Sequence, residues 1–347
     1  QKKNNFTEAL KIYNELIIQN NKNSQLLLFL GTLYLQIKNF HLAKDYLEQA
    51  YNIDKNNTLV INNLAVACEK LEEKDKAITL LEKSIEISKN NPETLFRIAN
   101  LFSSEKKYNL AIKNYRKAIE LKPNFIFAYL NLGNAQFESK FYEESIASFE
   151  KAISFNRNFI PSYLNTCRAL LKLNKFDQAL KYSDEIIKLD QMNIQGNLIQ
   201  GDINLILKNF SKALKNYERI IKIDPTHNLV LGKLIHTKMF LHDWKNYKKL
   251  LDDVIKYVNK NIMVIHPSIF LPLTDQPDLH LRASKIYADQ FYKKDLVNQN
   301  IAFEKKSKIN IGYFSSDFYD HATLRLMMDI FQHHDRSKFN IFGFAYG

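Results

Sequence analysis

Small residues recur along this chain at one fixed spacing. Seven positions, each 34 residues after the one before, hold a small side chain: Ala9, Ala43, Ala77, Ala111, Ser145, Ala179 and Ala213. A second series runs in the same phase through Gly31, Ala65, Ala99, Gly133, Cys167 and Gly201. A period of this length holds two helices and their turns, and such a pair buries its apolar face only when further copies stack on it. The spacing therefore restricts most of the chain to a stack of helical hairpins.

The 34-residue period is typical of tetratricopeptide (TPR) repeats. We expect the second series to mark where the two helices of a hairpin cross closely, because only a short side chain fits there. Larger apolar residues follow the small residue of each second helix by four positions and should fill the groove between helices; they are Tyr13, Leu47, Leu81, Tyr115, Phe149 and Tyr217. Residues 1–226 are thus predicted to form about seven TPR repeats, the first one partial, in an α-solenoid (a superhelix).

Composition agrees with long helices joined by short turns. Only 8 glycines and 7 prolines occur in 347 residues, which disfavours a sandwich, a barrel or a disordered tail. Cys68 and Cys167 lie at positions expected to be buried, and we interpret them as free thiols of a reducing compartment. The sequence contains neither an apolar run of membrane-spanning length nor a signal peptide at its start. We therefore expect a cytoplasmic protein with no membrane partner, and an upstream part that precedes Gln1.

The formal net charge of +12 suggests a nucleic-acid or anionic-surface partner as one interpretation. Against it, the lysines are scattered among glutamates, as they are between Lys70 and Lys76. No stripe of arginines interleaved with exposed aromatic residues stands out. We favour solvated helix faces as the explanation and expect no nucleic-acid partner.

The repeat register fades after Ala213. Residues 227–258 keep the length of a helical hairpin but hold Ile235 and Tyr247 where small residues are expected, which is typical of a degenerate capping hairpin. Residues 259–308 begin with three prolines in a short span, at 267, 272 and 277, and are predicted to form a linker plus one helix.

The residue pattern changes in the last part of the chain, residues 309–347. Apolar runs at 309–314 and 339–344 predict two strands, and the amphipathic stretch 322–331 between them predicts a helix. Parallel strands joined in this way place functional groups in the loop that follows the first strand. That loop holds Asp317, Asp320 and His321.

The segment IGYFSSDFYDHATLRLM, Ile311 to Met327, resembles the opening catalytic segment of the TPR-containing protein O-linked N-acetylglucosamine transferases and their bacterial relatives. Two upstream pieces are also similar to that family, an Asp-Trp element at 242–247 and a connecting segment at 266–273. The resemblance implies that 309–347 begins a Rossmann-like GT-B domain, truncated here. It implies inverting, metal-independent transfer of a sugar, with N-acetylglucosamine favoured, from a UDP donor to serine or threonine of proteins. The UDP-sugar is then a substrate, no cofactor is expected, and the chain alone is expected to be inactive because its donor-binding lobe would follow Gly347.

The resemblance also implies site residues. His321 matches a histidine that lines the family's active site, where an imidazole can accept or relay a hydroxyl proton or hydrogen-bond the sugar nucleotide. Asp317 is expected to orient the loop or the imidazole. An aspartate or a histidine just before a helix is also often only an N-cap, which binds free N–H groups of the first turn. We favour the cap for Asp320 and the catalytic role for His321.

Protein or peptide substrates are expected in the groove of the solenoid. In the family, asparagines two positions before the small residue of each first helix line the concave face, where an amide can pair with an extended peptide. Asn63, Asn131 and Asn165 match that position, whereas Phe29, Arg97 and Ile199 interrupt the series. The general abundance of asparagine in this chain is the alternative explanation.

Two further interpretations complete the prediction. His333, His334 and Asp335 are adjacent and lack further ligands at suitable spacing, so no metal site is expected. The alternative function is that of a TPR scaffold or adaptor for protein–protein interactions, with a degenerate α/β end.

Overall fold

The computed structural model describes residues 8–13, 15–16, 23–89, 91–292, 308–315, 330–331 and 333–345. It divides into two compact units, residues 1–287 and 288–347. Within these described ranges the first unit is helical and the second contains a two-stranded sheet. No helix of the described part is long and apolar enough to cross a bilayer.

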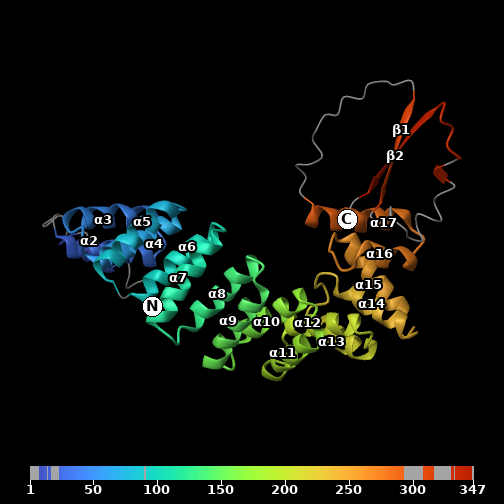
Figure 1. Cartoon of the computed structure of the whole chain (residues 1–347), viewed down its shortest axis with the longest axis horizontal. Helices are drawn as coiled ribbons and strands as arrows, with labels where there is room; N and C mark the ends of the chain where they lie inside the picture. The colour runs from blue at the N-terminus through green and yellow to red at the C-terminus, as the bar shows by residue number, and fades with distance from the viewer. Residues whose placement is uncertain are drawn as a thin grey trace. The chain divides into compact units, whose positions relative to one another are not determined.

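Among the described residues of the first unit, seven complete helical hairpins follow one another, each helix lying beside the next one along the chain (Figure 1). They are α2 (Ser24–Gln36) with α3 (Phe40–Ile53), α4 (Thr58–Lys70) with α5 (Lys74–Ile87), α6 (Pro92–Ser104) with α7 (Tyr108–Leu121), α8 (Ile126–Glu138) with α9 (Tyr142–Phe155), α10 (Ile160–Lys172) with α11 (Phe176–Leu189), α12 (Ile194–Ile206) with α13 (Phe210–Ile223), and α14 (Val230–Phe240) with α15 (Tyr247–Asn259). The predicted TPR solenoid is confirmed.

The close crossing predicted for each hairpin is also confirmed. A Cβ atom added to Gly133 would lie 2.4 Å from Cε1 of Phe149, and one added to Gly31 would lie 2.4 Å from Cγ of Leu47. Phe149 and Leu47 have no exposed surface. The large residue of the second helix therefore occupies the space that the small residue of the first helix leaves open.

In the fifth hairpin, α10 with α11, the two residues at the helix crossing differ in size from those of the other hairpins. Cys167 stands in the small-residue position, and the residue 16 positions later is Ser183 rather than a large apolar side chain. Both are fully buried, and the Cys167 thiol contacts the carbonyl oxygen of Ala179 at 3.4 Å. A larger residue on one helix is thus matched by a smaller one on the other. Both cysteines are free and buried, as predicted.

The turn inside each hairpin has the same backbone form. Residues 38, 72, 106, 140, 174, 208 and 242 are again 34 apart and have left-handed φ angles between 52° and 66°, although none is glycine. The next residue closes the first helix, as in the bond from Asn39 N to the carbonyl oxygen of Tyr34 at 2.9 Å. This bond satisfies a helix-terminal carbonyl and offsets the cost of the left-handed residue.

Residues 259–291 end the solenoid. The prolines prevent a long helix at first, leaving α16 (Pro267–Phe270) and the 3₁₀ turn η1 (Leu271–Leu273) before α17 (Pro277–Phe291). The apolar side chains of this segment are nevertheless buried, among them Val264, Ile265 and Phe270, in one cluster with Val254 of α15. The carbonyl oxygen of Val264 also accepts the N–H of Gly232 at 2.9 Å, near the start of α14. The segment predicted to be a linker is therefore part of the packed end of the solenoid.

The second unit contains β1 (Ile309–Ser315) and β2 (Phe339–Ala345), which pair in parallel from Ile309 opposite Phe339 to Ser315 opposite Ala345. Both predicted strands are confirmed. Parallel neighbours require a crossover between them. The predicted helix 322–331 lies outside the described residues except at 330–331, which are helical.

Candidate functional site

The three asparagines predicted to bind peptide occupy the same position of α4, α8 and α10 and are half-buried. Each amide reaches back to the preceding first helix. Asn63 Nδ2 donates to Thr32 Oγ1 at 2.9 Å, Asn131 Nδ2 to Asn100 Oδ1 at 2.8 Å, and Asn165 Nδ2 to Asn134 Oδ1 at 2.8 Å. In each case the acceptor residue lies 31 positions before the asparagine. It is therefore three residues, about one helical turn, after the position of the previous repeat that is equivalent to the asparagine. We call Asn63, Asn131 and Asn165 the ladder.

These bonds fix the orientation of the ladder amides but use only one of the hydrogen-bonding groups of each amide. An amide that donates one N–H keeps a second N–H and a carbonyl oxygen with two lone pairs. The oxygen of Asn165 contacts Arg168 Nη1 at 3.5 Å, which is a long bond. The ladder side chains can therefore still donate to and accept from an extended backbone.

A polar hollow of about 280 Å³ lies at the second ladder residue. It is lined by Asn100, Ser103, Ser104, Tyr115, Asn131 and Asn134. The hydroxyl of Tyr115 donates to Asn100 Oδ1 at 2.6 Å. Burial raises the pKa of the Tyr115 phenol, so the hydroxyl keeps its proton at neutral pH. The face of the first helices thus combines a polar recess with amides of fixed orientation.

One of the residues that interrupt the ladder, Arg97, also contacts the previous repeat. Arg97 Nη1 donates to the carbonyl oxygen of Asn62 at 3.2 Å, and its Nη2 lies 3.4 Å from Glu69 Oε2. One repeat beyond Ile199, Lys233 Nζ binds both carboxylate oxygens of Asp202 at 2.7 Å. Sequence reasoning missed this pair, although its 31-residue spacing is the same as that of the ladder bonds.

Asparagine abundance alone does not account for these positions. A separate series, Asn23, Asn57, Asn91 and Asn193, precedes first helices, and each side chain accepts backbone N–H groups of the first turn. Such capping is the usual task of asparagine at a helix start. The ladder residues lie inside helices, where asparagine has no such advantage. The chain therefore uses asparagine for two distinct purposes.

The predicted catalytic residues Asp317 and His321 lie outside the described residues. What the structure describes is the sequence on either side of them. β1 ends at Ser315, and the Tyr313 hydroxyl on that strand is hydrogen-bonded to His334 Nε2 at 2.6 Å. The rings of Tyr313 and Phe331 pack edge to face with centroids 4.8 Å apart. The chain that returns toward β2 is thereby held against β1.

The acidic and histidine residues near β2 have local partners. Ser337 donates its N–H and its hydroxyl to Asp335 Oδ1, which holds the pKa of that carboxyl below its usual range. Among the described residues, no group of three or more histidine, cysteine, aspartate or glutamate side chains could hold a metal ion.

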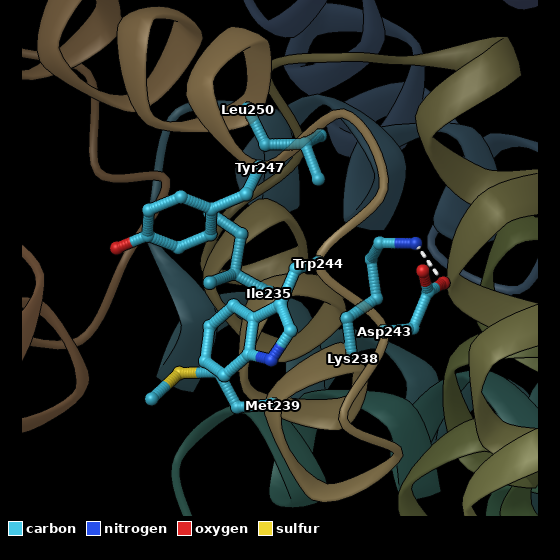
Figure 2. A pocket seen from close by; sticks show the side chains of 7 residues that line it. All are labelled: Ile235, Lys238, Met239, Asp243, Trp244, Tyr247 and Leu250. Carbon is cyan, nitrogen blue, oxygen red and sulfur yellow. Dashed lines mark hydrogen bonds and ion pairs between the residues drawn. The ribbon is translucent and has the colours of Figure 1, made fainter.

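The Asp-Trp element forms the turn between α14 and α15. Lys238 donates to Asp243 and holds the pKa of that carboxyl below its usual range. The Trp244 and Tyr247 rings meet edge to face at 5.5 Å. Figure 2 shows these side chains around a small pocket that Ile235, Met239 and Leu250 also line. The element therefore shapes the last hairpin.

Comparison with protein families identifies both parts of the chain. Tetratricopeptide repeat families match residues 24–57, 60–91, 128–159 and 165–228, and a TPR repeat family matches 99–140. Glycosyl transferase family 41 matches residues 241–347. This is a TPR repeat protein whose residues 241–347 match glycosyl transferase family 41. The match begins beside the Asp-Trp element and continues through β1 and β2, so it spans the end of the solenoid as well as the two strands.

Individual relatives agree with this assignment. The UDP-N-acetylglucosamine–peptide N-acetylglucosaminyltransferase of Caenorhabditis elegans is 28% identical over 118 residues, which cover 30% of this chain and 10% of that protein. The match thus spans about a tenth of the length of that curated relative. The crystal structure of the C-terminal part of a TPR repeat-containing protein from Cytophaga hutchinsonii superposes with a TM-score of 0.60 and 20% identity, covering 67% of this chain and 96% of that one. At that identity the likeness shows the fold alone.

Proposed function

We propose that this chain forms the acceptor-binding solenoid and the opening catalytic segment of a protein O-glycosyltransferase that acts in the cytoplasm. The enzyme would transfer a sugar from a UDP donor to serine or threonine hydroxyls of proteins. One observation carries the proposal, namely a family 41 region that begins at residue 241, directly after the repeats. N-acetylglucosamine is the proposed sugar because the C. elegans relative is named for its transfer to peptides.

The solenoid would hold the acceptor in extended form. A backbone in that form presents N–H and C=O groups at regular intervals, and a side-chain amide can donate to one and accept from the other. The ladder amides lie at the same position of the first helices α4, α8 and α10, with orientations fixed by their bonds to the previous repeat. Such contacts bind the backbone of the acceptor and not its side chains, so they suit an enzyme that accepts many different peptide sequences.

The proposed chemistry is an inverting displacement within a two-lobed GT-B domain. The acceptor oxygen forms a bond to the anomeric carbon while the bond from that carbon to the β-phosphate oxygen breaks. UDP leaves with the electron pair, and the hydroxyl proton must be removed. In this proposal His321 accepts or relays that proton or hydrogen-bonds the donor, and Asp317 orients the loop. The proposal requires no metal ion.

Radiolabelled transfer tests this function. The complete polypeptide that contains this chain would be incubated with tritiated UDP-N-acetylglucosamine and a protein extract, with other UDP- and GDP-sugars run in parallel. We expect label on serine and threonine. We expect His321→Ala to reduce transfer by about a hundredfold or more, as loss of a general acid or base does. The matched control is His41→Ala, at an exposed residue of α3, which should leave transfer unchanged.

Two outcomes would contradict the proposal. Failure of the folded wild-type protein to transfer any of these sugars, combined with retained peptide binding, would support the scaffold or adaptor function. Transfer that is unaffected by His321→Ala would remove the proposed role of the imidazole while leaving the transferase activity intact.

A further inference from the structure

The sixth complete hairpin, α12 with α13, departs from the pattern of the others in its interior. The position of Gln200 holds leucine or isoleucine in five of the six other hairpins, at Leu30, Leu64, Ile98, Leu132 and Leu234. The position of Asn197 holds leucine, isoleucine or tyrosine in all six others. Asn197 is fully buried, and Asn204 and Asn216 are 3% exposed. Buried polar groups at otherwise apolar positions weaken a core unless they serve another purpose.

These side chains form a connected network. Asn216 Nδ2 donates to Gln200 Oε1 at 2.7 Å and to Asn197 Oδ1 at 3.2 Å. Gln200 Nε2 donates to Asp184 Oδ1 at 2.6 Å, and Asn204 Nδ2 donates to the carbonyl oxygen of Gln200 at 2.8 Å. The donors are thus engaged. Within the part of the chain that the structure describes, Asn204 Oδ1 and Asn216 Oδ1 accept no hydrogen bond.

The same residues line a hollow of about 300 Å³. Its lining comes from α11 (Leu180 and Asp184), α12 (Gln200 and Asn204) and α13 (Lys212, Lys215, Asn216 and Arg219). The buried amides form its floor, and the exposed Asp184, Lys212 and Lys215 form its rim. None of these residues belongs to the ladder, so the hollow is a second polar site.

The lining of this hollow carries more positive than negative charge. Lys212, Lys215 and Arg219 follow one another at three and four positions, which places them on one face of α13. No acidic side chain of the described residues lies within ion-pair distance of any of the three. The single carboxylate at the rim, Asp184, accepts a hydrogen bond from Gln200 and offsets only one of these three positive charges. Three neighbouring cations around a recess create a field that attracts an anion.

We infer that this hollow binds an extended, acidic segment of a protein partner. The carboxylates of the segment pair with Lys212, Lys215 and Arg219, and its backbone N–H groups donate to Asn204 Oδ1 and Asn216 Oδ1. Sulfate, an inorganic anion that is fully deprotonated at neutral pH, satisfies only the first requirement, because it has no N–H or O–H to donate to the two amide oxygens. A peptide rich in glutamate or aspartate satisfies both. The inference does not depend on transferase activity.

Fluorescence anisotropy with the full chain tests the inference. The probe is a fluorescein-labelled decapeptide in which glutamate alternates with serine, and its neutral counterpart carries glutamine in place of glutamate. We expect the acidic peptide alone to bind. Lys212→Gln with Lys215→Gln should raise its Kd at least tenfold. The matched control is Lys113→Gln with Lys117→Gln, which removes the same charge from exposed positions of α7 and should change the Kd less than twofold.

A second variant separates the peptide from a simple anion. Asn204→Leu restores the residue type that Leu170 provides at the equivalent position of the previous hairpin, so the fold should tolerate it. It should weaken binding of the acidic peptide while leaving competition by sulfate unchanged. Equal binding of the neutral peptide, or equal losses in the two lysine pairs, would overturn the inference. Tighter binding of a single-stranded oligonucleotide that depends on the same lysines would also overturn it, in favour of nucleic acid.

Discussion

Asn100 on α6 should matter more for stability than the ladder residue that it orients. Its Oδ1 atom accepts the Tyr115 hydroxyl at 2.6 Å and Asn131 Nδ2 at 2.8 Å. Asn131→Ala removes one of these bonds and leaves Asn100 paired with Tyr115, so it should lower the free energy of unfolding by about 0.5–1.5 kcal/mol. Asn100→Ala removes both and leaves the hydroxyl of Tyr115, a residue only 1% exposed, without its acceptor.

The orphaned hydroxyl sets the size of the difference. An unpaired buried donor costs about 1–3 kcal/mol beyond the lost bond. The adjacent hollow of about 280 Å³ lets water approach, which favours the lower part of that range. Asn100→Ala should therefore be about 1–2 kcal/mol more destabilising than Asn131→Ala. Adding Tyr115→Phe to Asn100→Ala removes the orphaned group and should restore part of the loss.

Urea unfolding followed by far-ultraviolet circular dichroism measures these differences. Long repeat arrays can unfold in parts, so hydrogen exchange in α6, α7 and α8 provides the local readout. An Asn131→Ala variant as unstable as Asn100→Ala would refute the reasoning. A Tyr115→Phe substitution that adds to the loss, rather than reducing it, would do the same.

Three other predictions follow from the packing and the titratable groups. Gly133→Ala should destabilise the chain by about 1 kcal/mol in urea unfolding despite alanine's better helix propensity, because the new methyl meets the buried ring of Phe149; a stabilised variant would contradict the close crossing. A hydrogen bond from Lys44 is the main cause that lowers the pKa of Glu73 in the folded chain. The ionised Glu73 therefore stabilises the fold at pH values above its unfolded pKa, and this contribution is lost as the pH falls through the lower folded pKa. Glu73→Gln should therefore flatten the pH dependence of stability below about pH 5, and an unchanged acid profile in pH-jump unfolding would argue against the pair. Burial raises the pKa of Cys68 to about 11 and of Cys167 to about 12, so neither thiol should react with Ellman's reagent at pH 8 until urea is added; rapid labelling of the native chain would contradict this burial.

The 34-residue period predicted the solenoid because most hairpins repeat the same contact between a small residue of the first helix and a large residue of the second. Gly133 and Phe149 are recognisable from their spacing alone, and the structure places them in contact. The bonds of the ladder were not predictable in the same way. They depend on how far one hairpin is offset from the next, and this offset appears only as a 31-residue spacing between unlike residues, such as Asn63 and Thr32.

Local sequence signals were weakest where long-range contacts decide the structure. The prolines of residues 259–277 correctly predicted the absence of a long helix, but proline reports backbone conformation and not burial, so the packing of Ile265 and Phe270 was missed. The polar network of α12 was missed because asparagine and glutamine are common on helix surfaces. Asp317 and His321 lie outside the described residues, and their roles stay predictions.

Steady-state kinetics of the complete enzyme test the central claim most directly, namely that the ladder holds the acceptor for a family 41 active site. The test variant is Asn131→Ala with Asn165→Ala, and the control is Asn124→Ala with Asn158→Ala, two exposed asparagines between helices. With a protein acceptor that the wild-type enzyme labels, the ladder variant should raise the acceptor KM about tenfold, in line with the loss of one or two hydrogen bonds. The KM for the UDP-sugar, the kcat and the helicity should not change. An acceptor KM equal to that of the wild type and the control would contradict the account.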